Sequence, residues 1–503
     1  MANFDAVFVC VNEVIVAGVE ELDKEHYTET QTWLAMNDGV RLDASVLVPA
    51  GRAPADGWPA VLLVHGHGDT GCKASCLPRA RHLAQRGYVV AAYSVRGQGA
   101  SEGLTFHMGA REIFDLQDVV AWILSDCPVH PERLAVCGSS QGGWHAYMAA
   151  IHCPQVATVV PENVFTDYAS FVVRDGCLNR WFFTRTMRRR IMTAGFQELT
   201  RQWALAGEWE LLRTWMHERS PLNFADRIHC PVFIVHGWHD VGMPPNEVVE
   251  MYERLQVPKK LYLGAGGHDG VEHEDAKQLR ESLVDRWLDH WLQGEESGIL
   301  DEAPITVARR PGWDHVSLQS LTEETCRVYH LRVDGGLKDE PPDGPTVPSN
   351  INNFSTDPTY GLAQALRDDM EGVADALTRE EVVFESDPLD ADLSILGAPT
   401  ARLHILPNRP EVQVHAEVYD VSPEGEAMLI SRGHQGTRTA VAGRHRVADV
   451  RLATIHHTLA AGSRLRLVVA NYNSTFAYPF FVTSCTRLFH DDERPSTLTL
   501  PLA

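Results

Sequence analysis

The feature that most constrains the fold of this chain is a G-x-S-x-G pentapeptide at residues 138–142, which stands between two segments of different character. The apolar residues 134–137 before it predict a buried strand, whereas residues 143–150 after it predict a helix. A strand that turns at once into a helix holds the central residue in a strained conformation with its side chain exposed. Glycine at both ends removes Cβ atoms that would clash in so tight a turn. The spacing predicts a nucleophile elbow with Ser140 as the nucleophile.

From about residue 31 to residue 295, short apolar segments alternate with longer amphipathic ones. The short segments predict buried parallel strands, at residues 61–64, 89–92, 134–136, 156–160 and 232–235, and residues 260–263 form a further strand-like run. Two longer segments repeat apolar residues at helical spacing, at residues 113–124 and 279–291. The alternation of strand and helix predicts a doubly wound α/β sheet.

Residues 165–225 interrupt this alternation, because they contain no convincing strand and are rich in helix formers and aromatic residues. An insertion between strands would lie over the carboxyl ends of the sheet, so this segment predicts a helical cap. We expect Trp181 and Phe182 of this cap to shape the substrate pocket. The segment also concentrates arginine in an acidic protein, at Arg174, Arg180, Arg185, Arg188, Arg189, Arg190 and Arg201. A solvated helical face is the favoured interpretation of these arginines, and an anion-binding role is the alternative.

After residue 298 the pattern changes to alternation of apolar and polar residues, as at residues 327–333, 412–418 and 464–469. Period-two alternation predicts an antiparallel sandwich, and the Pro- and Asn-rich stretch at 341–358 predicts a long loop within it. We therefore predict two domains, a catalytic domain at residues 1–302 and an all-β domain at residues 303–503.

A serine hydroxyl is a poor nucleophile near neutral pH, so it needs a base to accept its proton and an acid to orient that base. Asp240 follows the strand predicted at 232–235, at a carboxyl end where such a sheet collects its functional groups. His268 lies in a glycine-rich loop after the next strand-like run. The order Ser140, Asp240, His268 is that of an α/β-hydrolase triad. Asp269 is a rival acid, but adjacent residues rarely point at one another as a triad requires.

The developing negative charge of an acyl-transfer reaction needs hydrogen-bond donors. One predicted donor is the backbone N–H of Gln141, immediately after the nucleophile. The second is the backbone N–H of His67, in the His-Gly-His-Gly-Asp loop that follows the strand at 61–64. The sequence therefore predicts an oxyanion hole built from these two backbone groups.

The same loop suggests a rival chemistry, because His65-x-His67-x-Asp69 begins like the H-x-H-x-D-H zinc signature of metallo-β-lactamase-type hydrolases. Thr70 stands where that signature has its final histidine. The departure disfavours a metal site, and we expect neither a metal nor a cofactor.

With these residues in place, the chain resembles the cocaine esterase and X-prolyl dipeptidyl aminopeptidase family of serine hydrolases. The similar motifs are M-x-D-G-V-x-L at 36–42, R-G-x-G-x-S-x-G at 96–103, D-x-x-x-W at 118–122, and the segments 386–389, 418–421 and 462–467. The resemblance implies an α/β-hydrolase with a helical cap and a carboxy-terminal jelly roll. It also implies a Ser140, Asp240 and His268 triad that hydrolyses esters or amides without a cofactor.

The chain departs from that family at two places. Ser94 replaces the Asp that usually opens the R-G-x-G loop, and the His-Gly-His-Gly loop replaces the segment that supplies a Tyr hydroxyl in cocaine esterase. In this loop the chain looks more like acetylxylan esterases and cephalosporin deacetylases, which use backbone donors there. We therefore predict a small-molecule carboxylic ester as substrate, with an amidase, X-prolyl peptidase or acylase as the alternative. An inactive carbohydrate-binding protein is a third possibility, against which the complete triad argues.

The composition of the chain limits which binding partners and which cellular location we expect for it. The formal net charge of -23 would repel nucleic acid and an anionic membrane surface. The ten cysteines are scattered, as expected for reduced cytosolic thiols. We see no signal peptide at the start of the sequence and no apolar run of the ~18 residues that a membrane helix needs. These observations predict a cytoplasmic protein and leave its oligomeric state open.

Overall fold

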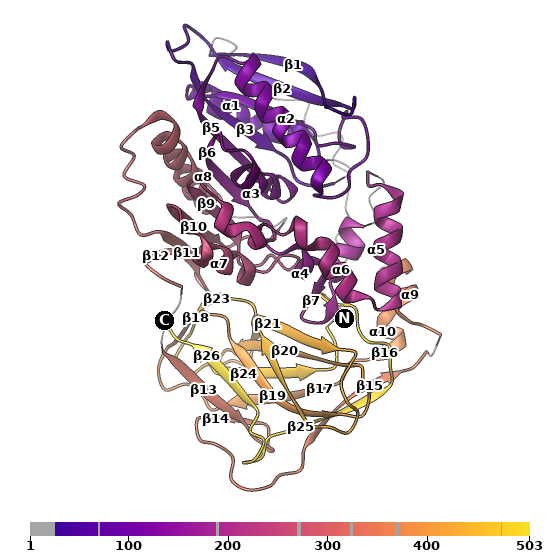
Figure 1. Ribbon diagram of the computed structural model, residues 1–503. Coiled ribbons are helices and arrows are strands. Elements are labelled where there is room, and N and C mark those ends of the chain that lie inside the picture. The colour runs from indigo at the N-terminus through magenta and orange to yellow at the C-terminus, as the bar shows by residue number, and fades with distance from the viewer. Residues whose placement is uncertain are drawn as a thin grey trace.

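The computed structural model describes residues 26–503, except residues 69–70, 188–190, 269–272, 322–324, 358, 369, 371 and 474. An α/β domain and a β-rich domain lie one above the other in Figure 1, and the helices α5 and α6 flank the region where they meet. This is the α/β-hydrolase fold with a carboxy-terminal β-rich domain that the sequence predicts. The predicted residues Asp69, Arg188 to Arg190 and Asp269 lie outside the described residues.

The α/β domain is built on a ten-stranded sheet whose strand order is β1-β2-β4-β3-β5-β6-β9-β10-β11-β12. The pairs from β4 to β11 are parallel, and the outer pairs β1–β2, β2–β4 and β11–β12 are antiparallel. The strands are β1 (Tyr27–Ala35), β2 (Arg41–Pro49), β3 (Trp58–Val64), β4 (Val89–Tyr93), β5 (Val129–Ser139), β6 (Val156–Glu162), β9 (Val232–Gly237), β10 (Lys259–Gly264), β11 (Ile305–Arg309) and β12 (Asp314–Leu318). The doubly wound parallel sheet predicted from the apolar runs is confirmed.

Helices cover both faces of this sheet, which explains why its strands are apolar without alternation. In β3, Val61 and Leu63 pack into one hydrophobic cluster with α1 (Leu77–Gln85) and α8 (Glu274–Leu288). The intervening Leu62 packs into another cluster on the opposite face. Three helices contribute to that second cluster, namely α2 (Ala110–Asp126), α3 (Gln141–His152) and α7 (Pro245–Arg254).

The first sheet extends past the domain boundary predicted between residues 302 and 303. Strand β11 pairs in parallel with β10, and β12 pairs with β11 as an antiparallel edge. Short strands that follow a glycine-rich segment have the same pattern whichever sheet they join, so their partner could not be read from the sequence. The α/β sheet therefore ends at Leu318 rather than before residue 303.

The cap consists of α4 (Tyr168–Val172), α5 (Ala194–Ala206), α6 (Trp209–Met216) and several short turns of 3-10 or π-helix. It also contains a two-stranded hairpin, β7 (Val173–Arg174) and β8 (Cys177–Leu178), where the sequence predicts no strand. The hairpin turn uses positive φ angles, 46° at Asp175 and 75° at Gly176. Strands of two residues are too short to produce a periodic pattern, which explains the missed prediction.

The β-rich domain is almost entirely antiparallel, since β14 and β17 are the one parallel pair among the strands of its described residues. Its strands are β13 (Cys326–Leu331), β14 (Gly336–Lys338), β15 (Ser349–Ser355), β16 (Leu377–Thr378), β17 (Glu381–Ser386), β18 (Leu393–Gly397), β19 (Thr400–Pro407), β20 (Val412–Val421), β21 (Ala427–Thr437), β22 (Arg446–Arg451), β23 (Ile455–Leu459), β24 (Arg464–Ala470), β25 (Ser484–Phe489) and β26 (Thr497–Pro501). Two short helices, α9 (Leu362–Asp368) and α10 (Val373–Ala376), interrupt them.

One strand of this domain, β15, lies inside the stretch 341–358 that the sequence predicts as a loop. Its asparagines are unusual for a strand, but their amides are used. Asn353 donates from Nδ2 to the carbonyl oxygens of Phe480 and Val482, at 2.6 Å and 2.9 Å. Tertiary hydrogen bonds therefore stabilise a strand that local propensity disfavours.

The cap hairpin joins the cap to the β-rich domain through backbone hydrogen bonds. The Gly436 N–H donates to the Asp175 carbonyl oxygen at 2.7 Å, and the Tyr478 N–H donates to that of Leu178 at 3.0 Å. A Cβ atom on Gly176 would lie 1.9 Å from the Gly436 oxygen, so the two backbones meet where only glycine fits. The β-rich domain thereby fixes the position of the cap.

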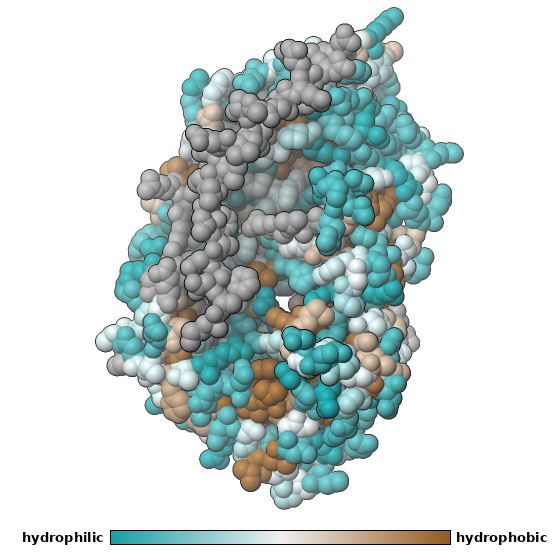
Figure 2. Space-filling view, turned by 180° about the vertical axis from the view of Figure 1, so that it is seen from behind, coloured by the Kyte–Doolittle hydropathy of each residue, from teal (hydrophilic) through white to brown (hydrophobic). Residues whose placement is uncertain are grey.

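Within the described part of the chain, no helix is both long and apolar enough to cross a membrane. Where atoms are coloured in the view from behind, the surface is mainly hydrophilic, with smaller hydrophobic patches on both halves (Figure 2).

Candidate active site

The nucleophile elbow forms where β5 ends at Ser139 and α3 begins at Gln141. Ser140 between them has φ 57° and ψ -118°, a conformation that side-chain-bearing residues rarely adopt. A Cβ atom on Gly142 would lie 1.9 Å from the carbonyl oxygen of Val64, and one on Gly138 would lie 2.4 Å from it. Both glycines are required because the elbow packs against the end of β3.

The structure brings the three residues of the predicted triad together. His268 Nε2 lies 3.0 Å from Ser140 Oγ, and His268 Nδ1 lies 2.6 Å from Asp240 Oδ2. The Asp240 side chain is fully buried, and its Oδ1 accepts hydrogen bonds from the N–H groups of Gly242 (3.1 Å) and Met243 (2.8 Å). The carboxylate is thus held by its own loop while it orients the imidazole toward the hydroxyl.

The two predicted oxyanion donors also lie beside the nucleophile. Gln141 is the first residue of α3, directly after Ser140. In the loop after β3, a Cβ atom on Gly66 would lie 3.5 Å from the Ser140 Cβ atom. The next residue, His67, is therefore close to the elbow. The His67 imidazole Nδ1 lies 2.9 Å from Gln141 Oε1, so the two donor-bearing segments are directly connected.

Sequence reasoning did not single out Gln98, which ties these two segments together. Its side-chain amide donates to Gln141 Oε1 at 2.9 Å and accepts the Gly68 N–H at 3.1 Å. Gln98 is buried and occupies the variable position of the R-G-x-G motif. The signal that the sequence offered was a polar residue at the variable position of this motif.

We expect Gln98→Met to lower kcat for an ester substrate by about 10- to 100-fold, because misplacing reacting groups by about 1 Å costs that much. KM should change less than kcat, since the side chain positions donors and does not line the pocket at Ser140. The matched control is Gln117→Met, which removes a half-buried amide that donates to the carbonyl oxygen of His152, at the end of α3 opposite Gln141. Unchanged kcat in a folded Gln98→Met protein would show that the loops are positioned without it.

A small pocket of about 80 Å³ opens at Ser140 and His268. Trp181 lines it, with its ring centroid 5.5 Å from that of His268 in an edge-to-face arrangement. Arg185 also lines it, with its guanidinium carbon 5.0 Å from the Trp181 ring centroid. Phe182 does not: its side chain is fully buried in the cap core against Phe171, Phe183 and Tyr168. In a helical segment, neighbouring residues face different sides, so only one of the two predicted aromatics reaches the pocket.

A second residue that the sequence did not reveal is His107, which lines the same pocket. Its ring centroid is 4.5 Å from that of His67, and its Nδ1 contacts the hydroxyl of Tyr168. Burial holds the pKa of His107 well below its ordinary value, so the imidazole is neutral near neutral pH. No motif surrounds this position, and a single histidine in a loop gives no sequence signal.

The arrangement of His65, the first residue of the rival zinc motif, does not support a metal site. His65 is buried, its Nε2 accepts the Val95 N–H at 2.9 Å, and its Nδ1 lies 2.7 Å from the Gly66 oxygen. Burial lowers the pKa of His65 to about 4. Both ring nitrogens are therefore engaged within the protein. Among the residues with described positions, no group of three or more His, Cys, Asp or Glu side chains could hold a metal ion.

Comparison with known families finds two matches along the chain. Residues 38–270 match the X-Pro dipeptidyl-peptidase (S15 family) model, and residues 344–492 match that of the X-Pro dipeptidyl-peptidase C-terminal non-catalytic domain. The putative Xaa-Pro dipeptidyl-peptidase of Streptomyces avermitilis is 22% identical over 384 residues, which cover 68% of this chain and 53% of that protein. The one of Bacillus cereus is 34% identical over 95 residues, 18% of this chain and 16% of that protein. The chain therefore matches about half or less of the length of these relatives.

Solved structures share the whole architecture at low sequence identity. An α-amino acid ester hydrolase superposes with a TM-score of 0.76 and 16% identity, covering 98% of this chain and 100% of that one. An aminopeptidase from a Thaumarchaeota archaeon gives a TM-score of 0.74 and 16% identity, covering 98% of both chains. A CocE/NonD family hydrolase from Staphylococcus aureus gives 0.73 and 13%, covering 95% of this chain and 94% of that one. At these identities the likeness concerns the fold.

Proposed function

We propose that this serine hydrolase cleaves carboxylic esters of small molecules through an acyl-enzyme on Ser140, in a domain that matches the S15 family model and precedes one that matches the X-Pro dipeptidyl-peptidase C-terminal model. The observation that carries this proposal is the continuous hydrogen-bonded series from Ser140 Oγ through His268 to the buried Asp240 carboxylate. A hydroxyl within 3.0 Å of an oriented imidazole is the arrangement that activates a serine.

In the proposed reaction, Ser140 Oγ attacks the ester carbonyl carbon while His268 Nε2 accepts the hydroxyl proton. The N–H groups of Gln141 and His67 donate to the oxyanion that forms. His268 then gives the proton to the departing alkoxide, which leaves as an alcohol. In the second half, His268 takes a proton from water, and the resulting attack releases the carboxylic acid and restores Ser140. Asp240 holds the imidazole in place throughout.

The lining of the pocket favours an ester over a dipeptide. A dipeptidyl peptidase must accommodate the free α-ammonium group of its substrate, for which a carboxylate is the natural partner. No Asp or Glu is among the described residues that line the space at Ser140, and the cationic side chain there is Arg185. An ester with a neutral acyl group needs no such carboxylate. Cleavage of X-prolyl peptides or other amides is the second candidate, supported by the S15 match and by the names of the relatives.

The two candidates are separated by three chromogenic substrates: p-nitrophenyl butyrate, glycyl-prolyl p-nitroanilide and its N-acetylated form. We expect turnover of the butyrate ester and release from neither anilide above the background of the Ser140→Ala protein. Cleavage of the free anilide without cleavage of the acetylated one would instead assign an X-prolyl dipeptidyl peptidase. A folded protein that turns over none of the three and does not react with a fluorophosphonate would indicate a binding protein.

A further inference from the structure

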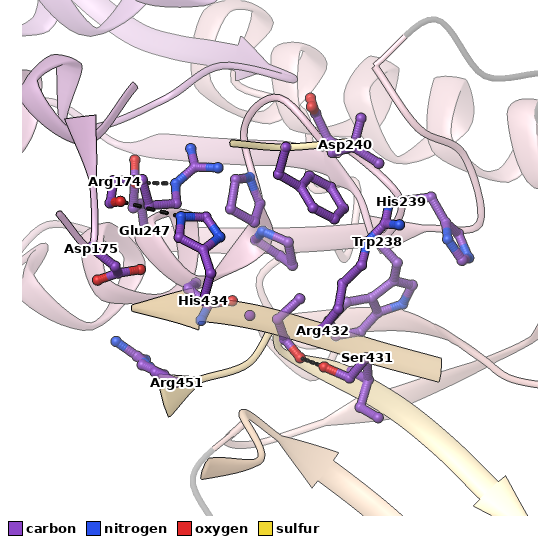
Figure 3. A pocket seen from close by; sticks show the side chains of 18 of the residues that line it. Arg174, Asp175, Trp238, His239, Asp240, Glu247, Ser431, Arg432, His434 and Arg451 are labelled. Atoms are coloured by element: carbon purple, nitrogen blue, oxygen red, sulfur yellow. Dashed lines mark hydrogen bonds and ion pairs between the residues drawn. The ribbon is translucent and has the colours of Figure 1, made fainter. Parts of the chain in front are cut away.

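A second cavity, of about 300 Å³, lies where the α/β domain, the cap hairpin and the β-rich domain meet (Figure 3). Its walls come from all three parts: Arg174 of the cap hairpin, the loop from Trp238 to Val241, and residues 429–434 of β21. The loop that carries Asp240 also borders the pocket at Ser140, to which it contributes Met243. The two spaces are thus distinct and share one loop as a wall.

The acidic groups around this cavity are already engaged or exposed. Both oxygens of Asp240 are used by His268 and the loop N–H groups, and Glu250 accepts from Arg254 at 2.6 Å. Glu247 Oε1 lies 3.8 Å from Arg174 Nε, and burial raises the pKa of Glu247 to about 8, so it is mainly protonated at pH 7. The remaining acid, Asp175, is exposed in the hairpin turn.

Three arginines line the cavity without a carboxylate at ion-pair distance among the described residues: Arg310, which is buried, Arg432, which is half-buried, and Arg451, which is exposed. Asp420 and Glu417 act on Arg310 and Arg432 only at longer range, because Asp420 Oδ2 lies 2.9 Å from His457 Nε2 and Glu417 pairs with Arg379 at 3.0 Å. Arg310 is 7% exposed and donates only to main-chain oxygens, those of Leu429 at 3.2 Å and Ile430 at 3.3 Å. No hydrogen bond or ion pair joins the Arg432 guanidinium to the described part of the chain; its central carbon lies 3.5 Å from the Phe476 ring centroid. Burial lowers the pKa of Arg432 to about 10, which leaves it charged at neutral pH. A guanidinium has five donors, so both side chains retain unused hydrogen-bonding capacity.

The charges of Arg310 and Arg432 both act on the pKa of His239, which also lines the cavity. Burial, and then the nearby charges of Arg310 and Arg432, lower the pKa of His239 to about 4. In Figure 3 the Arg432 side chain rises from β21 toward the loop of Trp238 and His239. The site therefore combines a neutral imidazole with two shielded guanidinium groups that form no ion pair with a described carboxylate.

The rest of the lining is largely apolar and aromatic. It includes Val241, Pro244, Ile430, Ile455 and Phe476, together with Trp238. A volume of about 300 Å³ is at the lower end of the range of small-molecule sites. A guanidinium pairs with a carboxylate in a bidentate manner, and apolar walls favour a hydrocarbon body over a multiply charged anion.

We propose that this interdomain cavity binds a monocarboxylate with an apolar body, such as an arylalkanoate, through Arg432 and Arg310. The carboxylate accepts hydrogen bonds from the two guanidinium groups, and the body packs against the apolar wall. This proposal does not depend on the reaction at Ser140, although the acids that ester hydrolysis would release belong to the same chemical class. The site is separate from the substrate pocket.

The test is calorimetric titration of the full chain with 4-phenylbutanoate, for which we expect one site with a Kd below about 1 mM. Arg432→Gln should weaken binding at least about tenfold, the usual effect of losing a charge-assisted hydrogen bond. The uncharged 4-phenylbutanamide should bind the native protein at least about tenfold more weakly for the same reason. Because Arg310 holds β21 in place, Arg432 is the residue to replace.

Two further variants locate the binding. Arg451→Gln removes the same charge from an exposed residue of the same cavity and should change Kd by less than about threefold, because exposed charges contribute little. Arg185→Gln alters the pocket at Ser140 and should leave Kd unchanged. Absence of binding at about 5 mM, or equal Kd for native protein and Arg432→Gln, would overturn the proposal. Loss of binding in Arg185→Gln alone would place the acid at Ser140 and would equally refute it.

Discussion

The Ser140→Ala variant is expected to lose ester hydrolysis by a factor of about 10⁴ to 10⁶ in kcat while keeping its fold. Ser140 supplies the atom that forms the acyl-enzyme, and its Oγ lies 3.0 Å from His268 Nε2, which accepts the hydroxyl proton in the proposed reaction. Alanine is tolerated sterically, because it keeps the Cβ atom that the elbow already accommodates. The measurement is the turnover of p-nitrophenyl butyrate, with thermal unfolding as the check on folding.

The matched control is Ser139→Ala, which removes a hydroxyl from the neighbouring position at the end of β5. We expect this variant to keep most of the activity, since the elbow directs only the central residue toward His268. If Ser139→Ala loses the activity and Ser140→Ala keeps it, the register of the elbow is wrong.

Asp240→Asn should lower kcat by about 10⁴, the loss known for the corresponding change in a serine protease. The buried carboxylate accepts three hydrogen bonds, from His268 Nδ1 at 2.6 Å and from the N–H groups of Gly242 and Met243. An asparagine amide has one oxygen for these donors, and its NH₂ group would force the imidazole into the tautomer that cannot accept the Ser140 proton. Single-turnover acylation by the same chromogenic ester measures the loss directly.

The comparison variant for this prediction is Asp269→Asn, which replaces the acid next to His268 in the sequence. We expect it to affect kcat far less than Asp240→Asn does. A larger loss at Asp269 than at Asp240 would overturn the assignment of the acid.

The sequence could predict the elements whose signals are local and strong. The elbow was recognisable because a G-x-S-x-G pattern between strand and helix leaves few alternative conformations, and the structure shows why both glycines are needed at Val64. The parallel sheet was recognisable because helices cover both of its faces, so its strands are continuously apolar. The order of Ser140, Asp240 and His268 then indicated which loops would meet.

Features that depend on distant partners could not be predicted in the same way. Strand β11 joins the α/β sheet only because β10 offers a free edge, and β15 exists because the amide of Asn353 finds carbonyl acceptors far along the chain. The burial of Phe182 depends on which side of a short helical turn faces the cap core. Arg174 was expected on a solvated helical face, but it lies in the β7 hairpin strand, with a side chain only 11% exposed beside Glu247.

The central claim is that Ser140 is an activated nucleophile in this chain. The most direct measurement is mass spectrometry of the protein after reaction with a fluorophosphonate, with peptide mapping of the modified residue. We expect one adduct per chain, on the peptide that contains residues 138–142 and specifically at Ser140, and no adduct in Ser140→Ala. An adduct at Ser139, an adduct that persists in Ser140→Ala, or an unlabelled native protein would contradict the account.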